Sequence, residues 1–512
     1  KKKRLSLARD RIGEKPLYWG WAGQTLVFGS ELKALRQHPD FPRKICREAT
    51  AQYLRFGYVP APRSIHHGIY KLEPGCILEV EGTSPPTSPE QPLRPGERMG
   101  SLSIRRYWSL NKAIETGASN QFENEDQALA ALDAALNTAV SRQTIADVPL
   151  GAFLSGGIDS SLIVALMQQQ SSRPVQTFTV GFENAGFDES PHAASVARHL
   201  GTDHSTLIVT DAETRDVIPH LPDLYDEPFA DSSQIPTHMI CRAAREKVTV
   251  ALSGDAGDEL FGGYNRYFWG PKIWSRLRSV PHPLRRMLGA AMTTIPIEGW
   301  NRLGEMHQLL RPRELGVSRL GEKTHKLAGA FSDVNSIDDL YHGLVTVWQN
   351  PQKIVREAVE PGSILDDPLP EALSDDPAAR MMAQDMRSYL PDDILCKVDR
   401  AAMGVSLETR VPFLDPDVIA LSTRLPMQMK IRGSTGKWAL RQILYRHVPR
   451  ELIERPKTGF SIPLGDWLRG PLRDWAEDLL APEKLSADGL LDPRPIRLAW
   501  ADHLSGRRDW TH

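Results

Sequence analysis

The stretch Leu150 to Ser161 (LGAFLSGGIDSS) decides the fold. An apolar run enters a Ser-Gly-Gly turn, and a helix-like segment over residues 160–170 leaves it. A buried strand that turns through glycines into a helix points backbone N–H groups at one spot, which suits a phosphate or a pyrophosphate. Asp159 beside the turn is a candidate ligand for Mg²⁺. The pattern also fits an ordinary strand–turn–helix corner, because glycine turns are common in α/β proteins.

Strands and helices alternate around this stretch. Apolar residues recur at helical spacing over residues 124–143, which predicts a helix there. The pattern further predicts strands at 175–180, 204–209 and 248–252, and helices at 189–200, near 214–218 and at 233–247. This alternation is typical of an α/β fold with a doubly wound parallel sheet that is covered on both faces. Such sheets bind ligands at the carboxyl ends of their strands.

The segments before and after this α/β region have different sequence patterns. Within residues 1–82 the pattern predicts a strand at 4–8, a hairpin over 16–28, a helix at 30–37 and a strand at 76–80. Residues 83–105 are rich in Pro, Ser, Gly and charge, which predicts a linker or an exposed loop. The α/β core is expected to span about 124–264. The rest, about 265–512, is expected to be helical to its end.

Composition limits the class of partner. The length of 512 residues predicts two to four domains. A formal net charge of −2 gives no electrostatic argument for nucleic acid or for a membrane surface. No apolar run approaches the roughly 20 residues of a membrane-spanning helix. The four cysteines are far apart and lack metal-site spacing, which fits a reducing cytoplasm and not a disulfide scaffold.

A second stretch, Ser253 to Tyr264 (SGDAGDELFGGY), directly follows the strand expected at 248–252. Its acids repel one another unless a cation lies among them, and its glycines cost backbone entropy unless something must approach closely. Asp159 and Asp258 would lie at the ends of two strands of one sheet, where together they can hold Mg²⁺ between nucleotide phosphates. A solvated acidic turn is the alternative.

Standard nucleotide motifs do not fit. Residues 433–438 (GSTGKW) come nearest to a P-loop, but the spacing is wrong and no hydroxyl follows the lysine. The Ser-Gly-Gly turn itself contains no lysine. The cation there must therefore be a metal or come from elsewhere in the chain.

These motifs, taken in order, resemble a known family. SGGIDSS (155–161) looks like the pyrophosphate loop of the ATP pyrophosphatases, and with SGDAGDELFGGY (253–264) it resembles the synthetase domain of glutamine-hydrolysing asparagine synthetases. Further similar motifs are KVDR (397–400), LETRVPFLD (407–415) and RPKTGF (455–460). Residues 8–18 and 30–35 look like the end of that family's glutaminase domain.

The resemblance implies a domain organisation and a reaction. Residues 1–82 would be the end of a truncated type 2 glutamine amidotransferase domain, 83–105 a linker and 106–512 the synthetase domain, with a sheet of the ATP pyrophosphatase type. The enzyme would be a cytoplasmic ligase that converts L-aspartate to L-asparagine through β-aspartyl-AMP, releasing AMP and pyrophosphate. Its substrates would be aspartate, ATP and glutamine or ammonia, with Mg²⁺ as cofactor. Neither nucleic acid nor a membrane is expected, and the oligomeric state stays open, a homodimer included.

The resemblance also implies site residues. ATP and pyrophosphate would contact Leu154, Ser155, Gly156, Gly157, Asp159, Ser160, Val180, Ser253 and Gly254, and Mg²⁺ would bind Asp159 and Asp258. The catalytic residues would be Asp255, Lys457 and Arg410, and the aspartate-binding residues Lys397, Asp399 and Arg400. Asp255 stands where some members carry Glu. Lys457 would stabilise developing negative charge, although alone it would be taken for a surface lysine. Arg400 and Arg410 suit carboxylate clamps, or else helix-surface ion pairs with Asp399 and Glu408.

One departure from the family is large. Its N-terminal nucleophilic cysteine and its glutamine-binding residues are absent here, and Cys46 is no substitute. We expect either a fragment cut inside the glutaminase domain, which the non-Met first residue favours, or an enzyme that uses free ammonia. The alternatives are an enzyme that adenylates another carboxylate, such as a β-lactam synthetase, and a non-catalytic nucleotide-binding protein.

Overall fold

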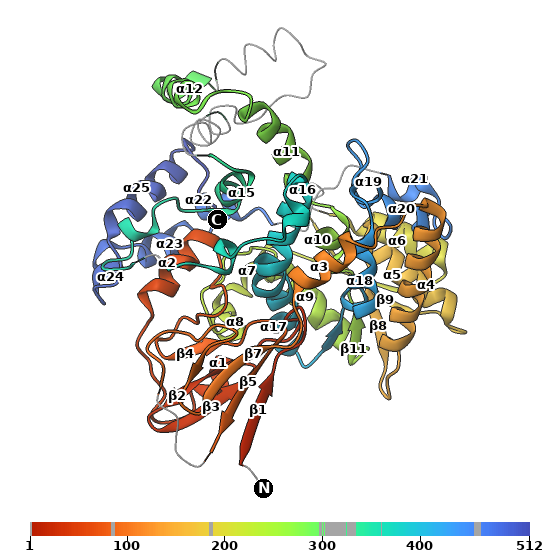
Figure 1. Cartoon of the computed structure of the whole chain (residues 1–512), viewed down its shortest axis with the longest axis horizontal. Helices are drawn as coiled ribbons and strands as arrows, with labels where there is room; N and C mark the ends of the chain where they lie inside the picture. Colours follow the sequence, from red (N-terminus) through yellow and green to blue (C-terminus); the bar gives the residue numbers. More distant parts are fainter. Residues whose placement is uncertain are drawn as a thin grey trace.

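The structure is a computed structural model that describes residues 3–82, 88–183, 188–295, 334–359, 361–454 and 462–511, with 299, 300, 302 and 324 (Figure 1). Its centre is a five-stranded sheet with the order β10–β9–β8–β11–β12. The strands are β8 (Leu150–Phe153), β9 (Gln176–Phe182), β10 (Asp203–Val209), β11 (Val250–Leu252) and β12 (Glu408–Arg410). All neighbouring strands pair in parallel, as predicted.

The strand order reverses beside β8. The chain moves outward from β8 through β9 to β10, and then returns to place β11 on the opposite side of β8. A reversal of this kind opens a crevice at the carboxyl ends of the two central strands. The predicted Ser-Gly turns follow β8 and β11, so the topology brings them to this crevice.

Helices cover both faces of this sheet, as predicted. Ala152 and Leu252 belong to a core formed with α4 (Glu125–Gln143), α5 (Ile158–Gln170), α18 (Pro416–Arg424) and α20 (Trp438–Leu444). Ala251 belongs to a second core with α9 (Gln234–Arg245) and α17 (Leu395–Met403). Adjacent strand residues point to opposite faces, which explains this division.

The fifth strand corrects the expectation that the chain is helical after Tyr264. β12 pairs with β11 over three residues, Glu408 to Arg410. A strand this short that contains two charged residues shows no apolar run. It forms because the sheet edge offers backbone hydrogen bonds, which a local pattern does not reveal.

The N-terminal part consists of two antiparallel sheets with the orders β1–β5–β7–β6 and β3–β2–β4, drawn at the lower end of Figure 1. The strands are β1 (Arg4–Ala8), β2 (Tyr18–Ala22), β3 (Thr25–Gly29), β4 (Ile69–Lys71), β5 (Cys76–Glu81), β6 (Arg98–Met99) and β7 (Leu102–Arg106), with helices α1 (Leu32–Leu35) and α2 (Arg47–Phe56). The strands expected at 4–8 and 76–80 and the hairpin are confirmed.

The predicted linker is wrong at its end. β6 and β7 lie within or across residues 83–105, and β7 pairs with β5 over five residues. Leu102 and Ile104 alternate with polar residues and are buried in the core between the two N-terminal sheets. This alternation is a strand signal that the nearby prolines obscured. Residues 83–87 lie outside the described part.

The remaining helices lie along the chain from residue 110 onward, and most of them follow residue 264. They are α3 (Leu110–Ala118), α6 (Ser190–Leu200), α7 (Asp211–Arg215), α8 (Leu221–Tyr225), α10 (Gly257–Phe261), α11 (Arg266–Leu277), α12 (His282–Thr294), α15 (Ile337–Val345), α16 (Pro377–Gln384), the π-helix η5 (Asp385–Ile394), α19 (Met427–Lys430), α21 (Arg450–Ile453), α22 (Leu464–Arg469), α23 (Arg473–Leu479), α24 (Pro482–Ser486) and α25 (Pro493–Leu504). No helix in the described part of the chain is long and apolar enough to cross a membrane.

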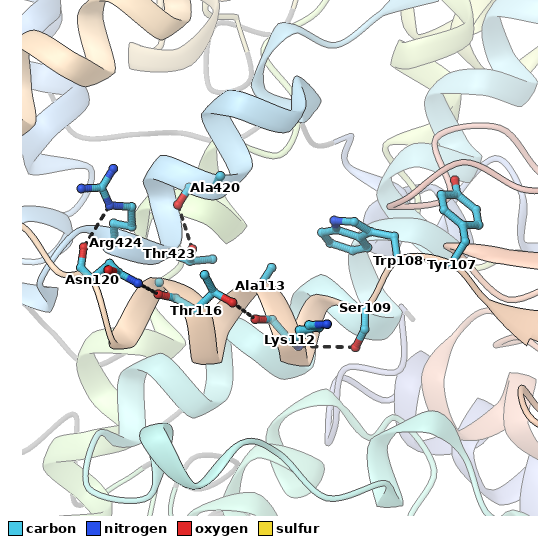
Figure 2. Close-up of a pocket in the computed structure, with 11 residues that line it drawn as sticks. Tyr107, Trp108, Ser109, Lys112, Ala113, Thr116, Asn120, Ala420, Thr423 and Arg424 are labelled. Atoms are coloured by element: carbon cyan, nitrogen blue, oxygen red, sulfur yellow. Dashed lines mark hydrogen bonds between the residues drawn. The ribbon is translucent and has the colours of Figure 1, made fainter.

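A hollow of about 550 Å³ lies between α3 and α18. Figure 2 shows Trp108 at one end and Arg424 at the other, where the Arg424 Nε donates to the Asn120 carbonyl over 2.9 Å. None of the predicted site residues lines this hollow, so it is separate from the site described next.

Candidate active site

The two Ser-Gly turns lie against each other at the ends of β8 and β11. A Cβ atom at Gly254 would come within 2.7 Å of the Ser160 amide nitrogen, and one at Gly257 within 2.3 Å of Asp159 Oδ1. A side chain at either position would therefore collide with the first turn. The close approach that the glycines were expected to serve is the packing of one turn on the other.

The first turn opens helix α5 in a form suited to an anion. Gly156 has φ +72°, and Gly157, which has no side chain, caps the start of the helix. The Ser155 amide donates to Ser160 Oγ over 3.1 Å, and the Gly157 amide donates to Ser155 Oγ over 3.3 Å. These contacts hold a backbone loop at a helix N-terminus, the arrangement that binds phosphate.

The second turn carries backbone strain. Ala256 adopts the left-handed conformation with φ +68°, which is uncommon outside glycine and costs free energy. Directly before it, the Ser253 hydroxyl donates to the Asp255 carboxylate. Burial raises the pKa of Asp255, and the nearby Asp159 and Asp258 carboxylates raise it further.

A lysine joins the two predicted metal ligands. The Lys437 ammonium lies 2.6 Å from Asp258 Oδ1 and also forms an ion pair with Asp159 Oδ2. Its side chain is only 6% exposed. Burial alone would lower the pKa of Lys437, but the two carboxylates outweigh it and hold the pKa above its usual value. Asp159, Asp258 and Lys437 are called the phosphate-end cluster below.

Lys437 belongs to residues 433–438, the stretch whose spacing does not match a P-loop. It stands at the start of α20 with φ +56°, and its amide donates to the Phe261 carbonyl over 3.1 Å. A Cβ atom at Gly436 would lie 2.3 Å from the Gly262 carbonyl oxygen, so the Gly-Lys step packs on the second acidic stretch. The cation that the first turn lacks thus comes from elsewhere in the chain. The sequence signal that could have identified Lys437 as this cation is a Gly-Lys pair directly before a helix.

The donor set fits Mg²⁺ in type and number. Asp159 and Asp258 are carboxylates that converge on one cation, the Lys437 ammonium. Among the residues that the structure describes, no group of three or more His, Cys, Asp or Glu side chains is arranged to hold a metal. Mg²⁺ typically takes one or two protein carboxylates and completes its shell with phosphate oxygens and water.

A second polar cluster lies around Lys397. The Lys397 ammonium is 2.7 Å from Asp231 Oδ2 and 2.8 Å from Ser233 Oγ, both just before α9. Lys397 also lowers the pKa of Asp255, so the two clusters are coupled through the second turn. The predicted residues Leu154, Val180 and Ser253 are buried. Leu154 and Ser253 directly follow β8 and β11, and Val180 lies within β9.

Behind the second turn, one further buried acid was not predicted. Glu259 is 1% exposed and accepts a 2.7 Å hydrogen bond from the Tyr264 hydroxyl. Burial, followed by repulsion from Asp258, raises the pKa of Glu259 to about 8.

Three predicted residues have their contacts away from the strand-end turns. The Asp399 carboxylate is 2.9 Å from the Lys15 ammonium, and Arg400 Nη2 donates to the Ser30 carbonyl over 2.6 Å. The Arg410 guanidinium donates to the Gln143 and Ile145 carbonyls. Arg410 also forms the ion pair with Glu408 that was the alternative prediction, with its Nε 2.6 Å from Glu408 Oε1, although the pair lies on strand β12 and not on a helix. Arg400 pairs instead with Glu31 of the N-terminal part. These contacts give no support to a substrate clamp. Lys457 lies outside the described residues.

Fold and site together define the class. This is an α/β protein with two glycine turns, two carboxylates and a buried lysine at the reversal point of a parallel sheet. Two family models match the chain: asparagine synthase over residues 131–512, which contain this site, and the glutamine amidotransferase domain over residues 1–88. The chain belongs to the asparagine synthase family, and it is a ligase of the glutamine-hydrolysing asparagine synthetase type.

Several relatives match almost the whole chain. A Mycobacterium tuberculosis protein assigned to the glutamine-hydrolysing asparagine synthetases is 34% identical over 99% of this chain and 73% of its own length. Asparagine synthetase 1 of Bacillus subtilis is 29% identical over 98% of this chain and 72% of its own. A Penicillium rubens protein named amidase chyE is 24% identical over 95% of this chain and 72% of its own.

Proposed function

We propose that this enzyme amidates L-aspartate to L-asparagine through β-aspartyl-AMP, on an ATP pyrophosphatase type of sheet. The aspartate carboxylate would attack the α-phosphate of ATP and expel pyrophosphate. Ammonia would then attack the acyl carbonyl and release asparagine, AMP and a proton. The observation that carries this proposal is the phosphate-end cluster between the two glycine turns.

The residues of the first turn would bind and orient the phosphates. The amides of Ser155 to Gly157 and the start of α5 provide donors at a helix N-terminus. The Lys437 ammonium is fixed by two carboxylates before any substrate binds, so its charge needs no reorganisation when the pyrophosphate gains charge. Mg²⁺, held by Asp159 and Asp258, would add positive charge at the same oxygens.

The acceptor end lies on the far side of the second turn. Asp255 is under the influence of both Lys397 and the phosphate-end cluster, which supports the prediction that it acts near the reacting carboxyl. We propose that Lys397 holds the acceptor there. Glutamine would supply the ammonia when a complete glutaminase domain is present.

The test is pyrophosphate release by the chain with ATP, Mg²⁺, ammonium chloride and a panel of carboxylic acids. We expect L-aspartate to give the highest rate and mass spectrometry to detect asparagine. Asp159→Asn should abolish release, and unimpaired turnover in that variant would remove the metal role. Stimulation by a different carboxylate alone would replace aspartate as the substrate.

A further inference from the structure

We infer that Glu227 is a positioning residue that acts on Lys397 from a distance, through the loop 226–233 (DEPFADSS). This loop connects α8 to α9 and is called the connecting loop below. The N-terminal part holds its first two residues, and its last three residues hold Lys397. The inference rests on the proposed function, in which Lys397 holds the acceptor, and it makes the N-terminal part a determinant of how well that lysine is placed.

The N-terminal part binds Glu227 from three sides. The Glu227 carboxylate accepts hydrogen bonds from the Tyr18 hydroxyl over 2.8 Å and from the Ile65 amide over 2.6 Å. It also lies 2.7 Å from the Lys71 ammonium, and its side chain is only 7% exposed. Charge-assisted hydrogen bonds in a buried place are strong and directional. Glu227 is therefore fixed relative to the N-terminal part.

Asp226, directly before Glu227, has a strained backbone that the N-terminal part maintains. Its φ is +64°, which is uncommon outside glycine. Its carboxylate accepts from the amides of Leu32 and Lys33 over 2.8 and 3.2 Å, and its carbonyl oxygen accepts from Arg36 Nη2 over 2.5 Å. Strain of this kind persists only where the surrounding structure fixes the residue. Helix α1 and its end thus fix the start of the connecting loop.

The other end of the connecting loop holds Lys397. As described above, the Lys397 ammonium contacts Asp231 and Ser233. Asp231 Oδ1 also accepts from the Ser233 amide over 2.8 Å and from the Ser233 hydroxyl over 2.7 Å. One oxygen of Asp231 thus binds the backbone of its own loop, and the other binds the lysine. Any shift of this backbone moves the partners of Lys397.

The segment 228–230, between the two ends of the connecting loop, is also packed. The Phe229 ring stacks on the Tyr225 ring, with centroids 5.0 Å apart and planes 5° from parallel. The Ala230 amide donates to the Gly57 carbonyl of the N-terminal part over 2.8 Å. A short segment with these contacts has little freedom to absorb a displacement. A movement at the start of the loop therefore reaches its end.

The first experiment measures KM values in Glu227→Gln, which removes the charge and nearly keeps the size of the side chain. Pyrophosphate release is followed with the full 512-residue chain, ATP, Mg²⁺ and ammonium chloride. We expect the KM for L-aspartate to rise about tenfold and the KM for ATP to stay within twofold, because Lys397 moves and the phosphate-end cluster does not. A purely structural role would reduce the amount of folded protein and leave both KM values unchanged. An unchanged KM for aspartate in the folded variant overturns the inference.

A double-mutant cycle tests the route from Glu227 to Lys397. Asp231→Asn should also raise the KM for aspartate about tenfold, since it removes the carboxylate that holds the lysine. If Glu227 acts through Asp231, adding Glu227→Gln to Asp231→Asn should change this KM by less than a further twofold. Two independent effects would multiply to about 100-fold, and that result would contradict the inference.

Lys15→Met is the control for a contact between the same two parts of the chain at another place. The Lys15 ammonium lies 2.9 Å from the Asp399 carboxylate, so it joins the N-terminal part to α17 directly. This variant should keep both KM values within twofold of the wild type. An equal rise in the KM for aspartate would mean that any loosening of the N-terminal part has this effect, and Glu227 would have no special role. Tyr18→Phe, which removes one hydrogen bond to Glu227 and no charge, is the second variant if Glu227→Gln does not fold.

Hydrogen exchange tests the inference without turnover. The Ala230 amide is bonded to the Gly57 carbonyl and the Ser233 amide to Asp231, so both are protected while the connecting loop is held. Exchange in a peptide that covers residues 228–234 should be at least about tenfold faster in Glu227→Gln and unchanged in Lys15→Met. Unchanged exchange in Glu227→Gln overturns the inference. If no acceptor supports pyrophosphate release, the proposed function fails, whereas faster exchange confined to Glu227→Gln still supports the link from Glu227 to the residues that hold Lys397.

Discussion

Two buried basic side chains in this molecule have opposite roles. Lys437 lies between Asp159 and Asp258 at the ends of two strands. Arg400, fully buried, reaches from α17 to the Ser30 carbonyl and to Glu31 in the N-terminal part. Lys437 gathers acids from two loops around one point, whereas Arg400 ties two regions of the chain together. Burial and charge alone therefore do not distinguish a candidate site from a structural link, whereas the convergence of two strand-end loops on Lys437 does.

The largest effect on activity is expected from a substitution of Lys437 in the phosphate-end cluster. Lys437→Met should lower pyrophosphate release at least about 1000-fold, because the fixed charge that stabilises the leaving group is lost. Initial-rate measurements at saturating ATP check this. A loss below tenfold would place Lys437 in a structural role, comparable to that of Arg400.

Substitution of Arg400 should change the stability of the protein and not its catalytic activity. Arg400→Met should lower the free energy of unfolding by about 3 kcal/mol, since it leaves buried acceptors on the N-terminal side without their partner. Chemical denaturation measures this. At a temperature where the variant is folded, its pyrophosphate release should match that of the wild type. A selective loss of activity would instead support the aspartate-binding role predicted for Arg400.

An effect on stability of similar size, but dependent on pH, is expected behind the second turn. The pKa of Glu259 is raised to about 8 from an ordinary value of 4.5, so its protonated form favours the folded state. That stability is fully present below pH 4.5 and is lost as the pH rises through 8. Glu259→Gln should therefore gain about 3 kcal/mol relative to the wild type between pH 4.5 and pH 7. Parallel curves of Tm against pH for the two proteins would contradict this.

The smallest effect is expected at Lys430, which lies seven residues before Lys437 and is also buried. Burial lowers the pKa of Lys430 to about 8, the opposite direction to Lys437, since only Asp376 opposes the effect. Lys430→Met should leave pyrophosphate release within twofold of the wild type and should not reduce Tm. This variant is the matched control for Lys437→Met.

Local patterns predicted the sheet but not the cation. The glycine turns could be placed because strand, turn and helix follow one another within a dozen residues, and the parallel order brings their ends together. The contact between Lys437 and Asp159 spans 278 positions and depends on how α20 docks, which no local period encodes. β12 was missed for the same reason.

The KVDR motif shows another limit. Residues 397, 399 and 400 were predicted to act together on aspartate, but Lys397 contacts Asp231 while Asp399 contacts Lys15 of the N-terminal part. Neighbours on a helix point in directions about 100° apart, so adjacency in a motif does not give a shared target.

The position of Lys437 late in the chain has a consequence for biosynthesis. Residue 437 leaves the ribosome 179 residues after residue 258, which is about 10 to 35 seconds at ordinary elongation rates. During that interval Asp159 and Asp258 have neither α20 nor its lysine beside them. Translation itself therefore delays completion of the phosphate-end cluster until α20 has been synthesised.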